Sequence, residues 1–402
     1  MRKWEGLAQI LQQGGLYALL FLLPFSKAAC EISFGFLFAG WLIDRLNPRT
    51  RRDTIWITPA THALRLWIWT FLLVSALSIL RSDYPMLGLR GFFSKWAEYF
   101  LFFVITADVV RRPGVVGRVL LFMTLGAVGV TLEAYSQWFR LHGLFRHYRY
   151  DMFDKMIGPY ENPNDFATYL IVVIPVLLST ALRVRWVVRV GLGVLLTLLL
   201  VCFLQTGTIA AYLGIMCSLP VIFSMHLTSR RFVGPLLGML LLSTAATLIY
   251  FSSVKDLVMH FQEIQVNRIA WLKSSLAMIR DRPFLGFGLN TFLSHYMDYW
   301  VGGIQVPVYA HNCYLQIAAE TGLIGLVMFL AVVMTLMRKL LTVARRLKDH
   351  KAVLLLGLIA GLTAYLVQAA FDTNFFSLRQ AVLFWVMAGI ALGISDPAEQ
   401  RV

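Results

Sequence analysis

The chain has 402 residues, 58% of them hydrophobic and 14% charged. Soluble domains are about half apolar and about a quarter charged, so this composition excludes an ordinary water-soluble protein. Apolar runs of about 20 residues recur along the chain, and a helix needs about that length to cross a bilayer. We therefore predict an all-α, polytopic membrane protein.

The net charge of +15 does not predict a nucleic-acid partner. The basic residues lie in loops between apolar runs, where they orient the spans by the positive-inside rule. The four cysteines include no CxxC pair, and they lie within or at the ends of apolar runs. Neither a disulfide framework nor a zinc site is expected.

Twelve spans are predicted, at residues 7–23, 28–46, 62–80, 92–109, 115–139, 164–183, 186–204, 206–224, 231–251, 311–343, 351–371 and 376–394. They divide the chain into nine spans in residues 1–250, a long outer loop in residues 251–310, and three spans with a cytoplasmic tail in residues 311–402. No well-placed cleavage site follows the first run, so it is interpreted as a span rather than a signal peptide.

Lysine and arginine fix the expected orientation. With the N-terminus inside, 22 of the 36 basic residues lie on the inner side and 14 on the outer side, so both termini are predicted to be cytoplasmic. The 14 outer residues cluster in the three longer outer loops. Either exposed loops simply tolerate them, or they surround an anionic substrate; we favour the second interpretation.

The long outer loop is predicted to be helical. Apolar residues at 269, 272, 276 and 279 recur at helical spacing, with Asn267 as a candidate N-cap and Pro283 as the end. After a glycine turn, residues 289–296 form a second short helix. The loop is therefore expected to make a helical hairpin over the bundle.

His311 opens the tenth span at the outer surface. An imidazole suits a general base for a sugar hydroxyl, although a lone histidine at a span end is equally an interfacial residue. Glu320 is about 13 Å further along the helix and does not reach His311 within it. A carboxylate inside an apolar span marks a functional or structural hydrogen-bond site.

Five arginines are candidates for binding phosphate, because a guanidinium holds phosphate oxygens in a bidentate fork. Arg268 and Arg280 lie on the predicted loop helix. Arg146 and Arg149 lie three apart in the loop before the sixth span, and Arg90 precedes the fourth span. Each of them could equally be a surface residue.

The segment before the sixth span, residues 158–167, reads Gly-Pro-Tyr-Glu-Asn-Pro-Asn-Asp-Phe-Ala. Asn164 or Asp165 is the expected N-cap, and Pro163 fixes the first turn. A capped helix start explains most of this segment, but Tyr160, Asn162 and Asn164 are also candidates to line a sugar site.

Signatures of metal and nucleotide chemistry are missing from the sequence. It contains no HExxH, GxSxG or GxxxxGK[ST] motif, and no DxD pair lies on the predicted outer side. Neither a metal nor a cofactor is therefore expected.

Two groups of residues resemble the O-antigen ligase / O-antigen polymerase superfamily. The first runs from Arg268 through residues 277–288 (Ala-Met-Ile-Arg-Asp-Arg-Pro-Phe-Leu-Gly-Phe-Gly) to His311-Asn312 and residues 320–325 (Glu-Thr-Gly-Leu-Ile-Gly). The second is Tyr160-x-Asn162-Pro163-Asn164-x-Phe166-Ala167. One departure is Ile209, which stands where the family often has an arginine, so that arginine's role must be absent or taken by another arginine.

The resemblance implies a GT-C-like, metal-independent, inverting glycosyltransferase in the bacterial inner membrane, with its active site at the periplasmic face among membrane lipids. The donor would be a glycan on undecaprenyl pyrophosphate, and the acceptor of a ligase would be lipid A–core oligosaccharide. His311 would assist the acceptor hydroxyl, and Arg268 would hold the pyrophosphate.

Two alternatives stay open. A polymerase of the same superfamily would extend the glycan on its lipid carrier. A transporter or flippase for polyprenyl-linked sugars would also need a basic cavity. It would place polar residues at mid-membrane, whereas here they gather at one predicted surface.

Overall fold

The structure is a computed structural model that describes residues 2–47, 54–139, 155–224, 254–302, 309–347 and 350–396. Within these ranges the chain forms helices and the turns that join them, and no β-strand. The predicted all-α class is confirmed. Arg146, Arg149 and the ninth predicted span, 231–251, lie outside the described residues.

The long helices follow the predicted apolar runs. They are α1 (Arg2–Leu22), α2 (Lys27–Leu46), α3 (His62–Leu80), α5 (Glu98–Val110), α6 (Val115–Trp138), α7 (Pro163–Ala181), α8 (Trp186–Gln205), α9 (Ile209–Ser224), α13 (Cys313–Arg346), α14 (His350–Gln368) and α15 (Leu378–Ile394). The long outer loop contains α11 (Val254–Asp281) and α12 (Phe292–Tyr296). Shorter elements are α4 (Pro85–Gly91), a π-helical turn η3 (Phe92–Ala97), and the 3-10 turns η1 (Ile55–Ile57), η2 (Pro59–Thr61), η5 (Met297–Tyr299) and η6 (Asn374–Phe376).

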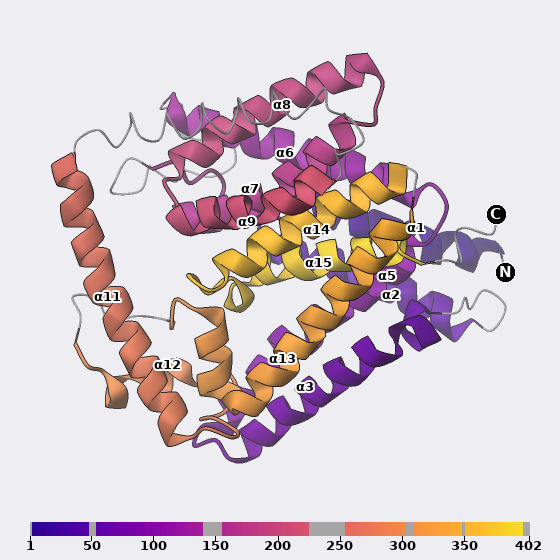
Figure 1. Cartoon of the computed structure of the whole chain (residues 1–402). Helices are drawn as coiled ribbons and strands as arrows, with labels where there is room; N and C mark the ends of the chain where they lie inside the picture. The colour runs from indigo at the N-terminus through magenta and orange to yellow at the C-terminus, as the bar shows by residue number, and fades with distance from the viewer. Residues whose placement is uncertain are drawn as a thin grey trace.

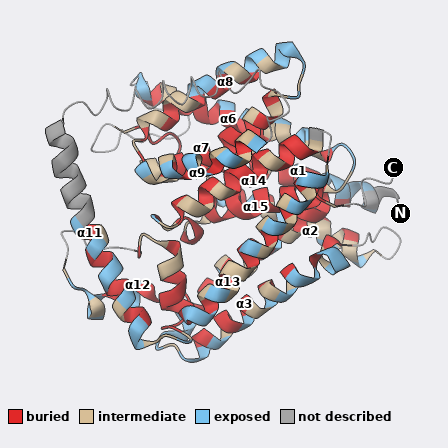
Figure 2. Ribbon diagram, in the orientation of Figure 1, coloured by how far each residue is buried: buried red, intermediate tan, exposed pale blue. Residues whose placement is uncertain are grey.

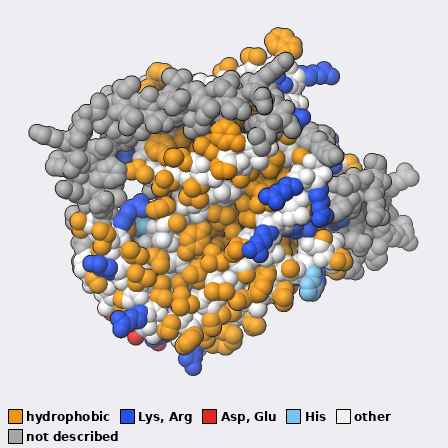
Figure 3. All heavy atoms as spheres, in the orientation of Figure 1, with side chains coloured by type: hydrophobic (Ala, Val, Ile, Leu, Met, Phe, Trp, Pro, Cys, Tyr) orange, Lys and Arg blue, Asp and Glu red, His pale blue; other side chains and the backbone are white. Residues whose placement is uncertain are grey.

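Six helical segments of the described chain are long and apolar enough to cross a membrane: Pro59–Leu80, Val115–Trp138, Pro163–Ala181, Trp186–Gln205, Cys313–Arg346 and Lys351–Gln368. Shorter apolar helices are Gly6–Leu22, Ile209–Ser224 and Leu378–Ile394. Large apolar side chains such as Trp69 on α3 and Trp186 on α8 are exposed. Figure 3 shows a broad apolar face with Lys and Arg gathered toward its edges. This surface is that of a multi-pass helical membrane protein.

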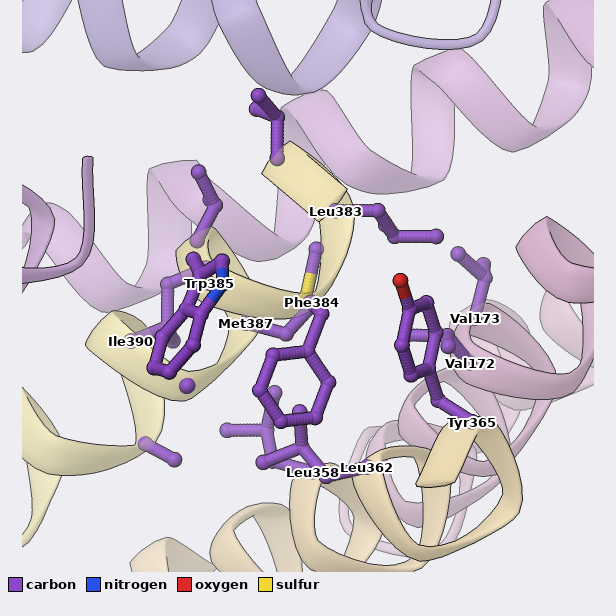
Figure 4. Packing of buried hydrophobic residues seen from close by; sticks show 14 of the residues in the cluster. Val172, Val173, Leu358, Leu362, Tyr365, Leu383, Phe384, Trp385, Met387 and Ile390 are labelled. Atoms are coloured by element: carbon purple, nitrogen blue, oxygen red, sulfur yellow. The ribbon is translucent and has the colours of Figure 1, made fainter. Parts of the chain in front are cut away.

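The centre of the bundle is formed by α7, α14 and α15 (Figures 1 and 2). Every residue of α15 after its first is buried, as expected for a helix that is apolar on all sides. The ring of Phe384 lies 4.9 Å from that of Tyr365 and 5.1 Å from that of Trp385 (Figure 4). This packed centre supports the loops at both ends of the bundle.

The loops predicted for the outer side meet at one end of the bundle. The Arg379 guanidinium is buried at the start of α15 and donates to the carbonyl oxygens of Pro24 at 2.8 Å and Pro159 at 3.1 Å. Lys27 pairs with Glu161 at 3.5 Å. Arg379 therefore braces three loops from within and is not part of a solvent-facing basic surface.

The loops predicted for the inner side meet at the opposite end. Asp108 accepts hydrogen bonds from Arg45 at 2.6 Å and Trp41 at 3.0 Å, and Arg111 forms an ion pair with Asp396 just after α15. The start of α1 and the end of α15 lie at this end (Figure 1). Among the described residues, these two sets of contacts therefore lie at opposite ends of the bundle.

An apolar cavity of about 720 Å³ lies between α2, α3 and α5. Its lining includes Arg45, Trp69 and Phe100 but neither His311 nor Arg268. The cavity belongs to the apolar layer of the bundle, and its walls suit a hydrocarbon chain rather than a sugar.

The span predicted at residues 311–343 corresponds to α13, which is long and apolar enough to cross a membrane, but this helix is not continuous because it breaks at Gly322. This residue has φ 73° and ψ 176°, a conformation essentially confined to glycine. It separates a short segment, residues 313–321, from a long one, residues 323–346. A break in a helix leaves backbone donors and acceptors without partners, and burying them unpaired is costly.

The turn that follows α11 supplies those partners. The Leu323 N–H donates to the carbonyl oxygen of Pro283 at 2.7 Å. The N–H groups of residues 287 and 288 donate to the carbonyl oxygens of Ala319 and Glu320, each at 2.9 Å. The segments 283–288 and 320–325, which are separate in the sequence, therefore form one structural unit that fastens the outer loop to α13.

Replacing Gly322 by Ala should destabilise the protein by more than about 2 kcal/mol. An added methyl group would lie 2.0 Å from the carbonyl oxygen of Phe284, and the backbone conformation excludes other residues. Thermal unfolding in detergent measures the loss. The control is Gly191→Ala in α8, where nothing lies within 4 Å and stability should rise by roughly 0.5–1 kcal/mol. Equal melting of both variants would contradict the role of the break.

Candidate functional site

The helix α11 lies across the end of the bundle where the loops predicted to be outside meet (Figure 1), and it packs on α13. Asn267 is buried well inside this helix, so the prediction that it caps the helix is wrong: helical structure begins at Val254. Trp271 and Met278 are also buried. They follow Asn267 by four and eleven residues, and residues at this spacing lie on the same face of a helix. This buried face brings the α11 side chains to the start of α13.

His311 lies directly before α13, where Asn312 forms the N-cap by accepting from the N–H groups of residues 314 and 315. The imidazole stacks on Trp271, with ring centroids 4.3 Å apart, and its side chain is 33% exposed. The backbone of His311 has φ 47°, a left-handed conformation that costs about 1–2 kcal/mol for an ordinary residue. The side chain is therefore held in one place yet remains accessible.

Arg268 lies one turn before Trp271 on the same helix. Its Nη1 donates to the carbonyl oxygen of Phe371 at 3.1 Å, in the turn between α14 and α15. Burial lowers the pKa of the Arg268 guanidinium, while the negative charge of Asp372 raises it. A guanidinium has five N–H donors and stays protonated in proteins, so this one contact fixes its position and leaves it suited to bind an anion.

Asp372 was not predicted, and the structure places it beside His311. Its Oδ1 lies 3.7 Å from Nδ1 of His311, and the side chain is 12% exposed. Oδ1 also accepts the N–H of Thr373 at 2.8 Å, which fixes the carboxylate. A signal was present in the sequence, because Asp372 is an acidic residue in the short turn between two apolar runs.

The segment 162–165 borders this cluster. Asn162, rather than the predicted Asn164 or Asp165, is the N-cap of α7: its Oδ1 accepts from the Asp165 N–H at 2.8 Å. The Asn164 side chain accepts from Thr208 at 3.1 Å. The carboxylates of Asp165 and Asp372 lie close enough for their charges to interact. Asn162 and Asn164 are thus near the turn that carries Asp372.

Tyr160 lies beneath this surface and not on it. It is fully buried, and the Arg379 guanidinium lies 4.4 Å from the centre of its ring. Burial holds the pKa of the Tyr160 phenol well above its ordinary value. Its observed contacts support the turn before α7 rather than present a group to a ligand.

The structure does not bring the remaining predicted arginines to His311. Arg280 is exposed at the end of α11, 12 residues and hence about 18 Å along the helix from Arg268. Arg90 is exposed on α4. Ile209 begins α9 and is 45% exposed, one residue after Thr208, so the missing family arginine would have stood near Asn164.

The cluster therefore combines one imidazole, one guanidinium and one carboxylate at an accessible edge of a membrane bundle. An imidazole beside a carboxylate can accept a proton from a hydroxyl, and a guanidinium can stabilise an anionic leaving group. In the described part of the chain, no group of three His, Cys, Asp or Glu side chains is placed to hold a metal ion. The imidazole and the guanidinium together suit group transfer to a hydroxyl.

The fold and this site define a multi-pass membrane protein with a polar reaction centre at one end of its helices. Residues 194–330, about a third of the chain, match the sequence model of a family described as O-antigen ligase. This match confirms the resemblance predicted from the motifs, for the part of the chain that it covers. The matched region contains Arg268 and His311 but ends before Asp372. No curated protein matches the chain.

Proposed function

We propose that the protein is an O-antigen ligase that transfers a glycan from undecaprenyl pyrophosphate to lipid A–core oligosaccharide. The observation that carries this proposal is the meeting of Arg268, His311 and Asp372 at one end of the bundle. A donor anchored in lipid can reach that end while its tail stays in the membrane.

In the proposed reaction, the acceptor hydroxyl oxygen attacks the anomeric carbon of the donor sugar from the face opposite the diphosphate. The bond from that carbon to the phosphate oxygen breaks, and the diphosphate leaves with the electron pair. Arg268 stabilises the negative charge on the diphosphate. His311 takes the hydroxyl proton on Nε2. The anomeric configuration inverts because the attack comes from the face opposite the leaving diphosphate.

Asp372 has a supporting role in this mechanism. A carboxylate facing Nδ1 favours the tautomer with its proton on that nitrogen, which leaves Nε2 as the base. It also stabilises the imidazolium that forms after proton transfer. The distance of 3.7 Å is longer than a hydrogen bond, and such contacts often tighten only when substrate binds.

The proposal includes the setting of the reaction. We place the protein in the bacterial inner membrane with about twelve spans, a GT-C-like arrangement and both termini in the cytoplasm, so that His311 faces the periplasm. The excess of Lys and Arg in the loops of the opposite end supports this orientation.

The direct test is transfer by the purified, reconstituted protein. Vesicles would receive undecaprenyl-pyrophosphate glycan and rough lipopolysaccharide with excess chelator, and the lipopolysaccharide would be analysed by gel and mass spectrometry. We expect glycosylated lipid A–core and no effect of the chelator. Longer glycan on the carrier with unchanged lipopolysaccharide would indicate a polymerase. Movement of donor across the vesicle without a covalent product would indicate a transporter.

Replacing Asp372 by Asn should lower the transfer rate by about 10- to 100-fold, because the imidazole loses the charge that orients it. Donor binding should change little, since Arg268 is held by the carbonyl oxygen of Phe371. Single-turnover rates and donor titration separate the two effects.

The matched control for that variant is Asp83→Asn. Asp83 lies 3.7 Å from His295, the same separation as in the Asp372–His311 pair, but at the other end of α11. We expect its replacement to change transfer by less than about threefold, as for an exposed ion pair. Equal rate losses in the two variants would refute a specific role for Asp372.

A further inference from the structure

Two residues of the described chain other than glycine have a left-handed backbone, Asn290 with φ 60° and His311 with φ 47°. Strained backbone of this kind persists only where surrounding contacts hold it, and it concentrates at functional sites. The two residues lie on different elements, one before α12 and one before α13. One buried carboxylate, Glu320, connects them.

Glu320 is 1% exposed and uses both of its oxygens. Oε2 accepts the backbone N–H of Asn290 at 2.8 Å, and Oε1 accepts from Nε2 of Gln316 at 3.1 Å. Lys95 donates to the side chain of Asn290 at 2.7 Å and attracts the Glu320 charge. The carboxylate is therefore fixed from two sides.

Gln316 extends this contact to the residue before His311. It is 1% exposed and lies one turn before Glu320 on α13. Its Oε1 accepts the backbone N–H of Ala310 at 3.3 Å, while its Nε2 faces Glu320. A carboxylate only accepts and a backbone N–H only donates, so the orientation of the Gln316 amide is determined by its two partners.

We infer that Glu320 and Gln316 are positioning residues that hold the strained backbone at His311. The contacts run from the Ala310 N–H through Gln316 and Glu320 to the Asn290 N–H. A backbone N–H group therefore lies at each end of this series. In this structure each side-chain oxygen accepts from one of these donors. With that geometry both N–H groups are paired when one side chain supplies two acceptors and the other supplies one acceptor and one donor. A carboxylate next to an amide meets that requirement, whereas two amides or two carboxylates do not.

The inference rests on the proposed function and is tested by exchanging the two side chains. Glu320→Gln leaves one N–H without an acceptor, and Gln316→Glu puts two carboxylates in contact. The double variant, Glu320→Gln with Gln316→Glu, restores one carboxylate next to one amide in the reverse order. The assay is steady-state glycan transfer in vesicles with rough lipopolysaccharide and varied concentrations of undecaprenyl-pyrophosphate glycan.

We expect each single variant to lose about 10- to 100-fold in kcat, as for a reacting group displaced by about 1 Å, with the donor KM changed less than about threefold. The double variant should recover to within about fivefold of the wild type. A KM that rises with an unchanged kcat would overturn the inference, because the loss would then lie in donor binding. So would a double variant that melts like the wild type but stays as slow as the single variants.

The matched control is the exchange of Glu133 and Gln137, a second buried pair with the same spacing on α6, joined by a contact of 3.1 Å. Each single variant of this pair, Glu133→Gln or Gln137→Glu, should lower kcat by less than about threefold. If Glu320→Gln and Gln316→Glu do not accumulate as folded protein, the kcat of the double variant alone tests the positioning role. Wild-type protein without transfer activity would refute the proposed function itself, whereas active single variants would refute only the positioning role.

Discussion

Replacing His311 by Asn should lower the rate of glycan transfer by about 10²- to 10⁴-fold, the usual contribution of a general base. Asn has no group that accepts a proton at neutral pH, yet it tolerates the left-handed backbone observed at this position. His311→Ala should lose the same activity and in addition melt earlier, since Ala is strained there. Single-turnover transfer and thermal unfolding, measured on the same reconstituted samples, separate the chemical loss from the structural one.

The control for these variants is His62→Asn, which replaces an exposed histidine at the first residue of α3. Its transfer rate should match the wild type. Full activity of His311→Asn would exclude the imidazole as the base and leave the proposed mechanism without a proton acceptor.

Replacing Arg268 by Ala should lower kcat by about 10²- to 10³-fold, because the charge that develops on the departing diphosphate loses its partner. Arg268→Lys should recover only part of this loss. An ammonium keeps the charge but cannot form a bidentate fork with phosphate oxygens. Titration with inorganic pyrophosphate as an inhibitor gives a second measurement, in which both variants should bind it more weakly than the wild type.

Arg280→Ala is the matched control for Arg268→Ala. It removes the same side chain from the same helix about 18 Å away and should change kcat and pyrophosphate inhibition by less than about threefold. Equal losses at positions 268 and 280 would indicate a general effect of positive charge on this helix and would contradict a specific phosphate contact.

The bundle itself was largely predictable, because apolar runs of membrane length specify helices with little help from the rest of the chain. Residues 266–279 were also predicted as helix from their periodicity. Which face of this helix is buried was not predictable from the sequence. Ile269, Leu272 and Leu276 are 43–50% exposed, whereas Asn267 and Ser274 are buried. Periodicity identifies a helix, but in a membrane protein an apolar stripe does not reveal whether it meets protein or lipid.

The candidate site was predictable in part. Arg268 and His311 were named from the sequence, and the structure places both in one cluster. Asp372 was missed because its contact with His311 joins residues 61 positions apart, and no local pattern reports such a distance. The break at Gly322 was missed for a related reason: it depends on backbone hydrogen bonds from residues 283–288, which an isolated sequence of α13 does not contain.

The exposed apolar stripe of α11 has a consequence for substrate choice. At about 100° per residue, Arg268 falls between the buried face of this helix and that stripe, and the helix runs across the end of the bundle (Figure 1). A helix with such a stripe rests in the boundary between acyl chains and headgroups. The guanidinium would then stand at the depth of lipid phosphates. Sugar nucleotides dissolved in the aqueous phase would have to descend to meet it, whereas diphosphates already tethered to a lipid would arrive by lateral diffusion.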